Sequence, residues 1–152
     1  MATRLGFWSA CLMIVTFAVF TAAFIAIPLT GPLYVWDDLS GYLAYVRGGH
    51  TFWQELARWM MLLFGPLTVI LFACLHDLAE GERQLLARIA LAFVVIFAAL
   101  TGINYFVQLT AVRLAVSRDA TLGLEQIVQA NPLSAAAAVN VLGWSLFFGL
   151  AS

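Results

Sequence analysis

Hydrophobic residues fill four long stretches of the chain that contain no charged side chain. Each stretch has enough consecutive apolar residues to cross a hydrocarbon core of roughly 30 Å as an α-helix. The pattern predicts an all-α fold, a transmembrane helical bundle of four spans that forms one domain over residues 1–152. The spans are expected at residues 6–30, 53–75, 85–112 and 132–152.

The first connection contains an amphipathic segment. Asp38 can cap a helix over residues 39–47, and Gly48-Gly49 can end it. Its apolar side chains fall on one face, which predicts a short interfacial helix lying on the membrane. That face is formed by Leu39, Leu43 and Val46.

The second span has a start signal of its own. Thr51 and Gln54 have the spacing of a capping box, and Glu55 is well placed in the first turn. Arg58 is expected to extend back along the helix and pair with Glu55.

The third connection predicts a second short interfacial helix. Asp119 or Thr121 can start it, and it should run to about Ala130. Asn131-Pro132 then predicts the start of the fourth span, with asparagine as N-cap and proline at the first helical position.

The connection between the second and third spans, residues 76–88, is short and highly charged, which predicts a tight antiparallel hairpin. Basic residues are almost evenly divided between the two sides of the membrane. The charged hairpin favours a cytoplasmic position. We therefore expect the N-terminus inside and both amphipathic connections outside.

Composition agrees with a membrane protein, because 64% of the residues are hydrophobic and only 10% are charged. The expected environment is the lipid bilayer, as a multi-pass protein of the cell membrane, the inner membrane of a bacterium. A net charge of −1 argues against a nucleic-acid partner, which requires a basic face.

Catalytic, cofactor and metal motifs are not found, so the sequence predicts no enzyme, no cofactor and no metal site. His50 and His76 flank the second span and should lie some 35 to 40 Å apart along it. His76 and Glu80 supply only two potential metal ligands, and such a pair is more typical of a solvated helix end. The enzymatic alternative is Asp37-Asp38 with Arg47 and His50, although helix capping already accounts for these carboxylates.

A polar stripe lies within the third span. Thr101, Asn104 and Gln108 recur at helical spacing, and polar groups that face lipid cost free energy. They should therefore point inward, with Asn140 of the fourth span as the best side-chain partner. Arg113, about 140° around the helix from Gln108, is expected to be an interface anchor. The stripe indicates either interhelical hydrogen bonds or a transport or ligand site.

Small residues in the first and fourth spans permit close backbone approach. Homo- or hetero-oligomers are therefore expected to form through these two spans. The residues are Ala18, Ala22 and Ala26 in the first span and residues 135–138 in the fourth.

The run Ile103-Asn104-Tyr105-Phe106-Val107-Gln108-Leu109-Thr110, followed by Arg113, Asn131-Pro132 and Leu142-Gly143-Trp144, resembles a family of uncharacterised bacterial multi-span membrane proteins. The resemblance runs from about Arg58 to the end and implies about six spans, with no established activity. This chain resembles an N-terminal four-span portion. We therefore expect the natural chain to continue beyond Ser152 or to meet another subunit there.

Two function classes follow from these patterns. The first is a non-enzymatic helical membrane module whose spans pack with each other and with partner subunits. The alternative is a small permease or ligand sensor that uses the polar stripe.

Overall fold

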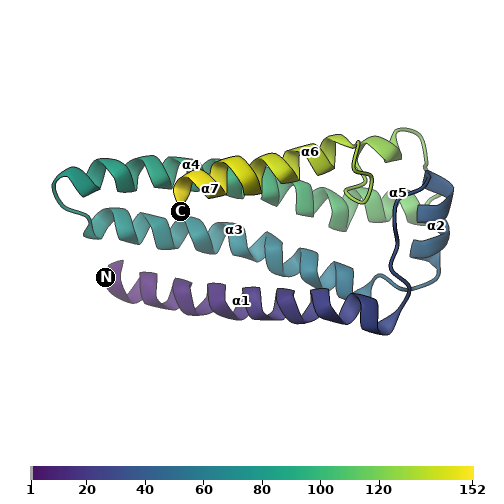
Figure 1. Cartoon of the computed structure of the whole chain (residues 1–152), viewed down its shortest axis with the longest axis horizontal. Helices are drawn as coiled ribbons and strands as arrows, with labels where there is room; N and C mark the ends of the chain where they lie inside the picture. The colour runs from purple at the N-terminus through teal and green to yellow at the C-terminus, as the bar shows by residue number, and fades with distance from the viewer. Residues whose placement is uncertain (1) are drawn as a thin grey trace.

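Four long helical segments lie roughly along one axis in the computed structural model, which describes residues 2–152 (Figure 1). Those residues contain helices and no strand, so the all-α prediction is confirmed. The helices are α1 (Ala2–Thr30), α2 (Leu39–Arg47), α3 (Phe52–Leu78), α4 (Glu82–Val107), α5 (Arg113–Ser117), α6 (Ala135–Leu142) and α7 (Gly149–Ala151).

Two π-helical segments join consecutive α-helices into longer ones. The segment η1 (Gln108–Val112) connects α4 to α5, and η3 (Gly143–Phe148) connects α6 to α7. Hydrogen bonds in a π-helix run from residue i to i+5, so each segment changes the face that the following residues present. A single 3₁₀ turn, η2 (Leu124–Gln126), lies between the two long composite helices.

Within residues 2–152, three helices are long and apolar enough to cross a membrane: Ala2–Thr30, Phe52–Leu78 and the composite helix Glu82–Ser117. The fourth predicted span is a shorter apolar helix, Ala135–Ala151. It rises about 25 Å, less than a hydrocarbon core of roughly 30 Å. Residues 2–152 therefore contain three helices long enough to span and one shorter apolar helix, so the predicted count of four spans is not confirmed.

The fourth helix also begins later than predicted. Asn131 is not its N-cap, because the Asn131 carbonyl oxygen Oδ1 accepts from the Leu133 backbone at 3.0 Å within a turn. The N-cap is Ser134, whose hydroxyl accepts from the Ala137 backbone at 3.0 Å. The turn places Pro132 before the helix instead of inside its first turn.

The first connection forms the expected helix α2, and Asp38 caps it by accepting from the Gly41 backbone at 2.6 Å. Gly49 follows in the left-handed region (φ 78°), which favours glycine and ends the helix. The apolar face of α2 packs on the protein, where Tyr42 is 4% exposed among side chains of α5 and the third connection. Partners in this end cluster include Val112, Val116, Leu124 and Val128.

The predicted helix of the third connection is wrong. Residues 119–130 contain only the 3₁₀ turn η2, because Asp119 (φ 54°) and Gly123 (φ 73°) take left-handed backbone conformations that interrupt a helix. The apolar residues of this segment nevertheless pack inward on α2 and α5. Figure 1 shows this segment and α2 at the end of the bundle opposite to the α3–α4 turn.

The start of α3 also differs from the prediction. Thr51 makes no side-chain cap, because its hydroxyl donates to the Glu55 carboxylate at 3.2 Å. Gln54 donates instead to the Tyr45 hydroxyl at 3.0 Å, which ties α3 to α2. The predicted capping box is therefore wrong, because Thr51 bonds to the first turn of α3 and Gln54 bonds to α2.

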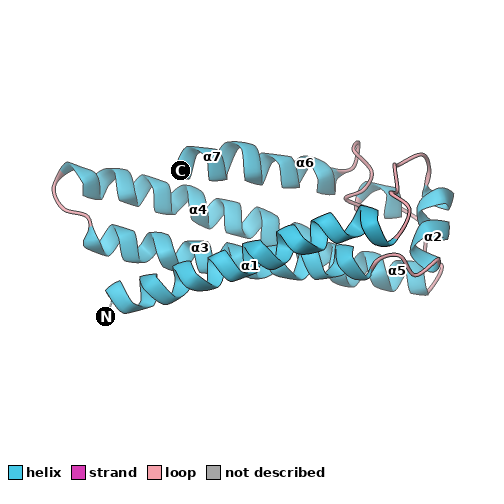
Figure 2. Cartoon of the chain, turned by 60° about the horizontal axis from the view of Figure 1, so that its bottom comes forward, coloured by secondary structure: helices cyan, strands magenta, loops and turns pink. Residues whose placement is uncertain are grey.

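Helix α1 lies obliquely across α3 (Figure 2). Its buried residues are Gly6, Ser9, Thr16 and Ala23, and the Ser9 hydroxyl donates to the Leu67 carbonyl at 2.6 Å. The predicted small-residue stripe does not make this contact, since Ala18 and Ala22 are exposed. The spacing of the contact residues, three and seven apart, matches the crossing of two long helices.

Aromatic rings fill the middle of the bundle. Phe97 of α4 is 1% exposed, and its ring centroid lies 4.9 Å from that of Trp144 and 4.8 Å from that of Phe148. Phe64 of α3 stacks on Trp144 at 6.0 Å. This aromatic core cluster joins α3, α4 and η3, and it also contacts α1 through Phe20.

Candidate functional site

The four residues of the predicted stripe lie along α4 and η1 and on α6. Thr101, Asn104 and Gln108 are buried, at 1%, 3% and 2% exposure, and Asn140 is half-buried. We call these four residues the polar seam. They face the protein, as expected for polar groups in apolar helices.

The centre of the polar seam is a bond between two side-chain amides. Asn104 Nδ2 donates to Asn140 Oδ1 at 3.2 Å, which is the pairing that the sequence predicted. The carbonyl oxygen of Asn104 is buried without a partner among residues 2–152. The two amides therefore share one hydrogen bond instead of two.

Gln108 bonds to backbone groups, which the sequence did not predict. Its amide Nε2 donates to the Ile127 carbonyl at 2.6 Å, and its Oε1 accepts from the Gln129 backbone at 3.0 Å. Gln108 therefore satisfies two main-chain groups of the third connection, where no regular helix does so. Hydrophobic periodicity cannot predict a contact between a side chain and the backbone of another segment.

Thr101 uses its hydroxyl within its own helix, donating to the Phe97 carbonyl at 2.8 Å. Its methyl group meets η3, where a Cβ built on Gly143 would lie 3.0 Å from Thr101 Cγ2. Glycine at this position permits the close approach of η3 to α4. Next to it, Trp144 donates through Nε1 to the Tyr105 hydroxyl at 3.3 Å.

One end of the polar seam reaches a cavity of about 420 Å³ between α2, α3, η1 and α5. Gln108 lines this cavity, while Thr101, Asn104 and Asn140 do not. Its charged lining residues are Arg47, Glu55, Arg58, Arg113 and Asp119.

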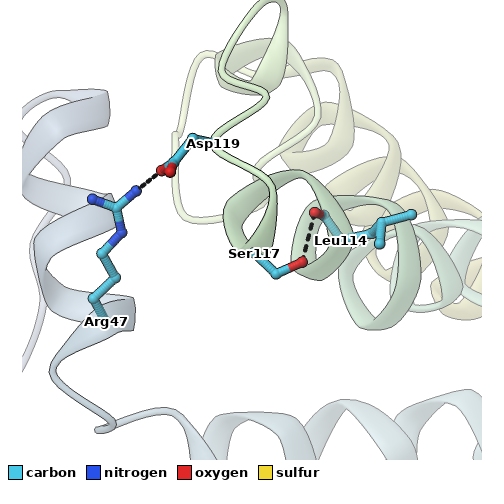
Figure 3. Close-up of polar contacts among 4 residues, drawn as sticks. All are labelled: Arg47, Leu114, Ser117 and Asp119. Carbon is cyan, nitrogen blue, oxygen red and sulfur yellow. Dashed lines mark hydrogen bonds and ion pairs between the residues drawn. The ribbon is translucent and has the colours of Figure 1, made fainter.

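Two ion pairs use most of these charges. Arg47 of α2 bonds to the Asp119 carboxylate (Figure 3). In the same view, the Ser117 hydroxyl donates to the Leu114 carbonyl at 2.8 Å. Arg113 Nη1 lies 3.0 Å from Glu55 Oε2. The predicted Glu55–Arg58 pair is therefore wrong, because Arg113 reaches Glu55 from the neighbouring composite helix.

Arg113 comes to the cavity because of η1. In a regular α-helix it would lie about 140° from Gln108, but the wider π-helical turns rotate less per residue. Gln108 and Arg113 consequently line the same cavity. The expected role of Arg113 as an interface anchor stays a prediction.

Arg58 differs from the other charged lining residues. It forms no ion pair and no side-chain hydrogen bond with residues 2–152. Burial raises the pKa of Tyr42 in α2 above its usual value, and the nearby positive charge of Arg58 opposes this rise. The guanidinium group therefore lies close to α2 without a carboxylate of its own.

Two members of the alternative catalytic group have other partners. The Asp38 carboxylate caps α2, and Arg47 pairs with Asp119. His76 lies 3.7 Å from Asp77, at the other end of α3 from His50. Within residues 2–152 no group of three or more histidine, cysteine, aspartate or glutamate side chains could hold a metal ion.

Its three long apolar helices, by length and composition, place the chain in the class of helical membrane proteins. Comparison with known proteins adds no narrower class: no family model, curated protein or solved structure matches the chain.

Replacing Asn104 by leucine is expected to lower the free energy of unfolding by about 0.6 to 2 kcal/mol, the range of one interhelical hydrogen bond. Asn104→Leu with Asn140→Leu should cost less than the sum of the single changes, because both remove the same bond. Detergent-micelle unfolding, followed by tryptophan fluorescence, measures these differences.

The matched control for this cycle is Ser145→Ala, since the exposed Ser145 hydroxyl donates only to its own helix, at Val141. Asn104→Leu and Ser145→Ala should be additive. Additivity of the Asn104 and Asn140 changes would contradict a bond between these amides.

Proposed function

We propose that this protein is a non-enzymatic helical membrane module whose third and fourth apolar helices are locked together by the polar seam. One observation carries the proposal: each buried side chain of the seam bonds within the protein, and only the Asn104 carbonyl oxygen lacks a partner among residues 2–152. Thr101 bonds to its own helix, Asn104 to Asn140, and Gln108 to the third connection. Groups used in this way stabilise packing instead of presenting themselves to a passing solute.

The setting of this module is part of the proposal. We propose a multi-pass protein of the bacterial inner membrane, related to the six-span family that its sequence resembles. Exposed apolar side chains along α1, including Phe7, Trp8 and Ile14, support contact with lipid or with a second membrane segment. Association through α1 and α6, as homo- or hetero-oligomer, belongs to the same proposal.

A second candidate is a ligand sensor, favoured by the cavity of about 420 Å³ at the α2 end. Gln108 connects this cavity to the polar seam, and both ion pairs lie at its rim. A ligand there would alter contacts of α2 with α5. The ligand would act at one end of the bundle and would not have to pass along the polar seam.

Single cysteines separate these functions, in a background with Cys11 and Cys74 replaced by alanine. Thr101→Cys should resist an impermeant maleimide from either side of the membrane, because position 101 is 1% exposed in a packed seam. Ser117→Cys and Glu80→Cys are the positive controls, because both positions are exposed and lie near opposite ends of the bundle. With the N-terminus inside, Ser117→Cys should react in intact cells and Glu80→Cys only after permeabilisation.

The outcomes discriminate between the candidates. Reaction of Thr101→Cys in the folded protein would show a water path through the polar seam and would support a permease. Reaction of Gln108→Cys from the Ser117 side, with Thr101→Cys protected, would support the sensor. Protection at both positions supports the packed module.

A further inference from the structure

A second hollow, distinct from the polar seam, lies between α1, the first half of α3 and the segment before α6. It has a volume of about 870 Å³, within the usual range for small-molecule sites. One wall is apolar and comes from α1, including Phe20, Phe24 and Leu29. The hollow is called the Arg58 groove below, after the residue at its polar end.

Among residues 2–152, Arg58 is the only charged residue that lines the Arg58 groove. It lies in the second turn of α3, about 9 Å along the helix from Phe52. An ionisable side chain within an apolar span costs free energy and normally has a partner. Arg58 has neither a carboxylate partner nor a side-chain hydrogen bond among residues 2–152.

The local charge balance leaves one positive charge. Arg58 also lines the neighbouring cavity, where Arg47 pairs with Asp119 and Arg113 pairs with Glu55. The two pairs are neutral, so Arg58 supplies a net charge of about +1 at the boundary of the two hollows. An anion is the complementary ligand, and a guanidinium group binds phosphate with two parallel hydrogen bonds.

A further donor lines the Arg58 groove. Gln129 has a side-chain amide that forms no hydrogen bond with residues 2–152, although its backbone N–H donates to Gln108. Arg58 and Gln129 therefore offer uncommitted N–H groups to the same groove from two different segments. A few polar groups in a mostly apolar hollow can fix the head group of a ligand.

The apolar wall decides between a soluble anion and a lipid. Phe24 and Leu29 are 62% and 78% exposed, on a helix long and apolar enough to cross a membrane, so the Arg58 groove is open toward the bilayer. A small soluble anion would make no use of this wall. An acyl chain would cover it, while the phosphate remained near the helix end where head groups lie.

We propose that the Arg58 groove binds an anionic phospholipid of the bilayer, with its phosphate on Arg58 and Gln129 and an acyl chain along α1. The proposal does not depend on whether the polar seam is dry. It makes Arg58 the residue that selects lipids by charge.

The test compares binding of phosphatidylglycerol and phosphatidylcholine with identical acyl chains to the purified full chain, by native mass spectrometry from a non-ionic detergent. Both lipids carry the phosphate, but the positive charge of Arg58 repels the choline cation of phosphatidylcholine, so the wild-type protein should prefer phosphatidylglycerol about tenfold. Arg58→Gln should reduce the preference to less than about twofold, and Arg58→Lys should retain part of it because the charge remains.

The matched control is Arg118→Gln, which removes the same charge from an exposed position at the same end of the bundle. It should leave the preference unchanged, because water screens a charge at an exposed site. Equal losses for Arg58→Gln and Arg118→Gln would assign the preference to diffuse surface charge and overturn the proposal.

Two further measurements use only the wild-type protein, so that a folding defect of a variant leaves the test intact. Equal binding of the two lipids would overturn the proposal. Glycerol 3-phosphate, which has the head group without acyl chains, should fail to displace phosphatidylglycerol even in large excess. Displacement by it would assign the groove to a soluble anion and overturn the lipid assignment.

Discussion

Gln108→Leu is expected to lower the free energy of unfolding by roughly 2 to 4 kcal/mol, because it leaves two partly buried main-chain groups without partners. Leucine has a similar size but can neither donate to the Ile127 carbonyl nor accept from the Gln129 N–H. These groups lie in the third connection, where the backbone has no regular helix to satisfy them. Unfolding in mixed micelles by a denaturing detergent measures the loss.

The control for Gln108→Leu is Gln84→Leu, the same change at an exposed position of the same composite helix. It should alter the free energy of unfolding by less than about 0.5 kcal/mol. Limited proteolysis should also show faster cleavage of Gln108→Leu within residues 119–130. Equal effects of the two leucine substitutions would contradict a structural role for the Gln108 amide.

Phe97→Ala is expected to cost about 2 to 3 kcal/mol, because it leaves a cavity in the aromatic core cluster. In a soluble protein the same change typically costs about 3 to 5 kcal/mol. Helices in lipid gain little from the hydrophobic effect, so lost packing contacts account for most of the remaining cost. The substitution removes the contacts of Phe97 with Trp144 and Phe148.

Phe106→Ala provides the comparison, since Phe106 lies on the same helix and is 56% exposed. It should change the free energy of unfolding by no more than about 0.5 kcal/mol. Phe97→Leu should cost less than Phe97→Ala, because leucine fills part of the cavity. A cost for Phe106→Ala as large as that for Phe97→Ala would mean that the packing between α4 and η3 is not what holds these helices together.

The candidate site could be predicted in part. Burial of Asn104 and Gln108 follows from the cost of turning an amide toward lipid, and Asn140 was chosen as the partner of Asn104 because it is an amide within the fourth predicted span. The partners of Gln108 could not be predicted, because the positions of the Ile127 carbonyl and the Gln129 N–H depend on an irregular segment. The Arg58 groove was missed for a related reason, since it is formed by segments distant in sequence.

The sequence by itself determined features that depend on neighbouring residues. Uncharged apolar runs predicted the long helices, and Asp38 with the spacing of Leu39 and Leu43 predicted α2, because capping and helical periodicity act within a few residues. Only the tertiary structure decided the pairing of Glu55 with Arg113 over Arg58. It also decided that η1 places Arg113 beside Gln108, since helix type and ion-pair choice depend on which distant segments pack together.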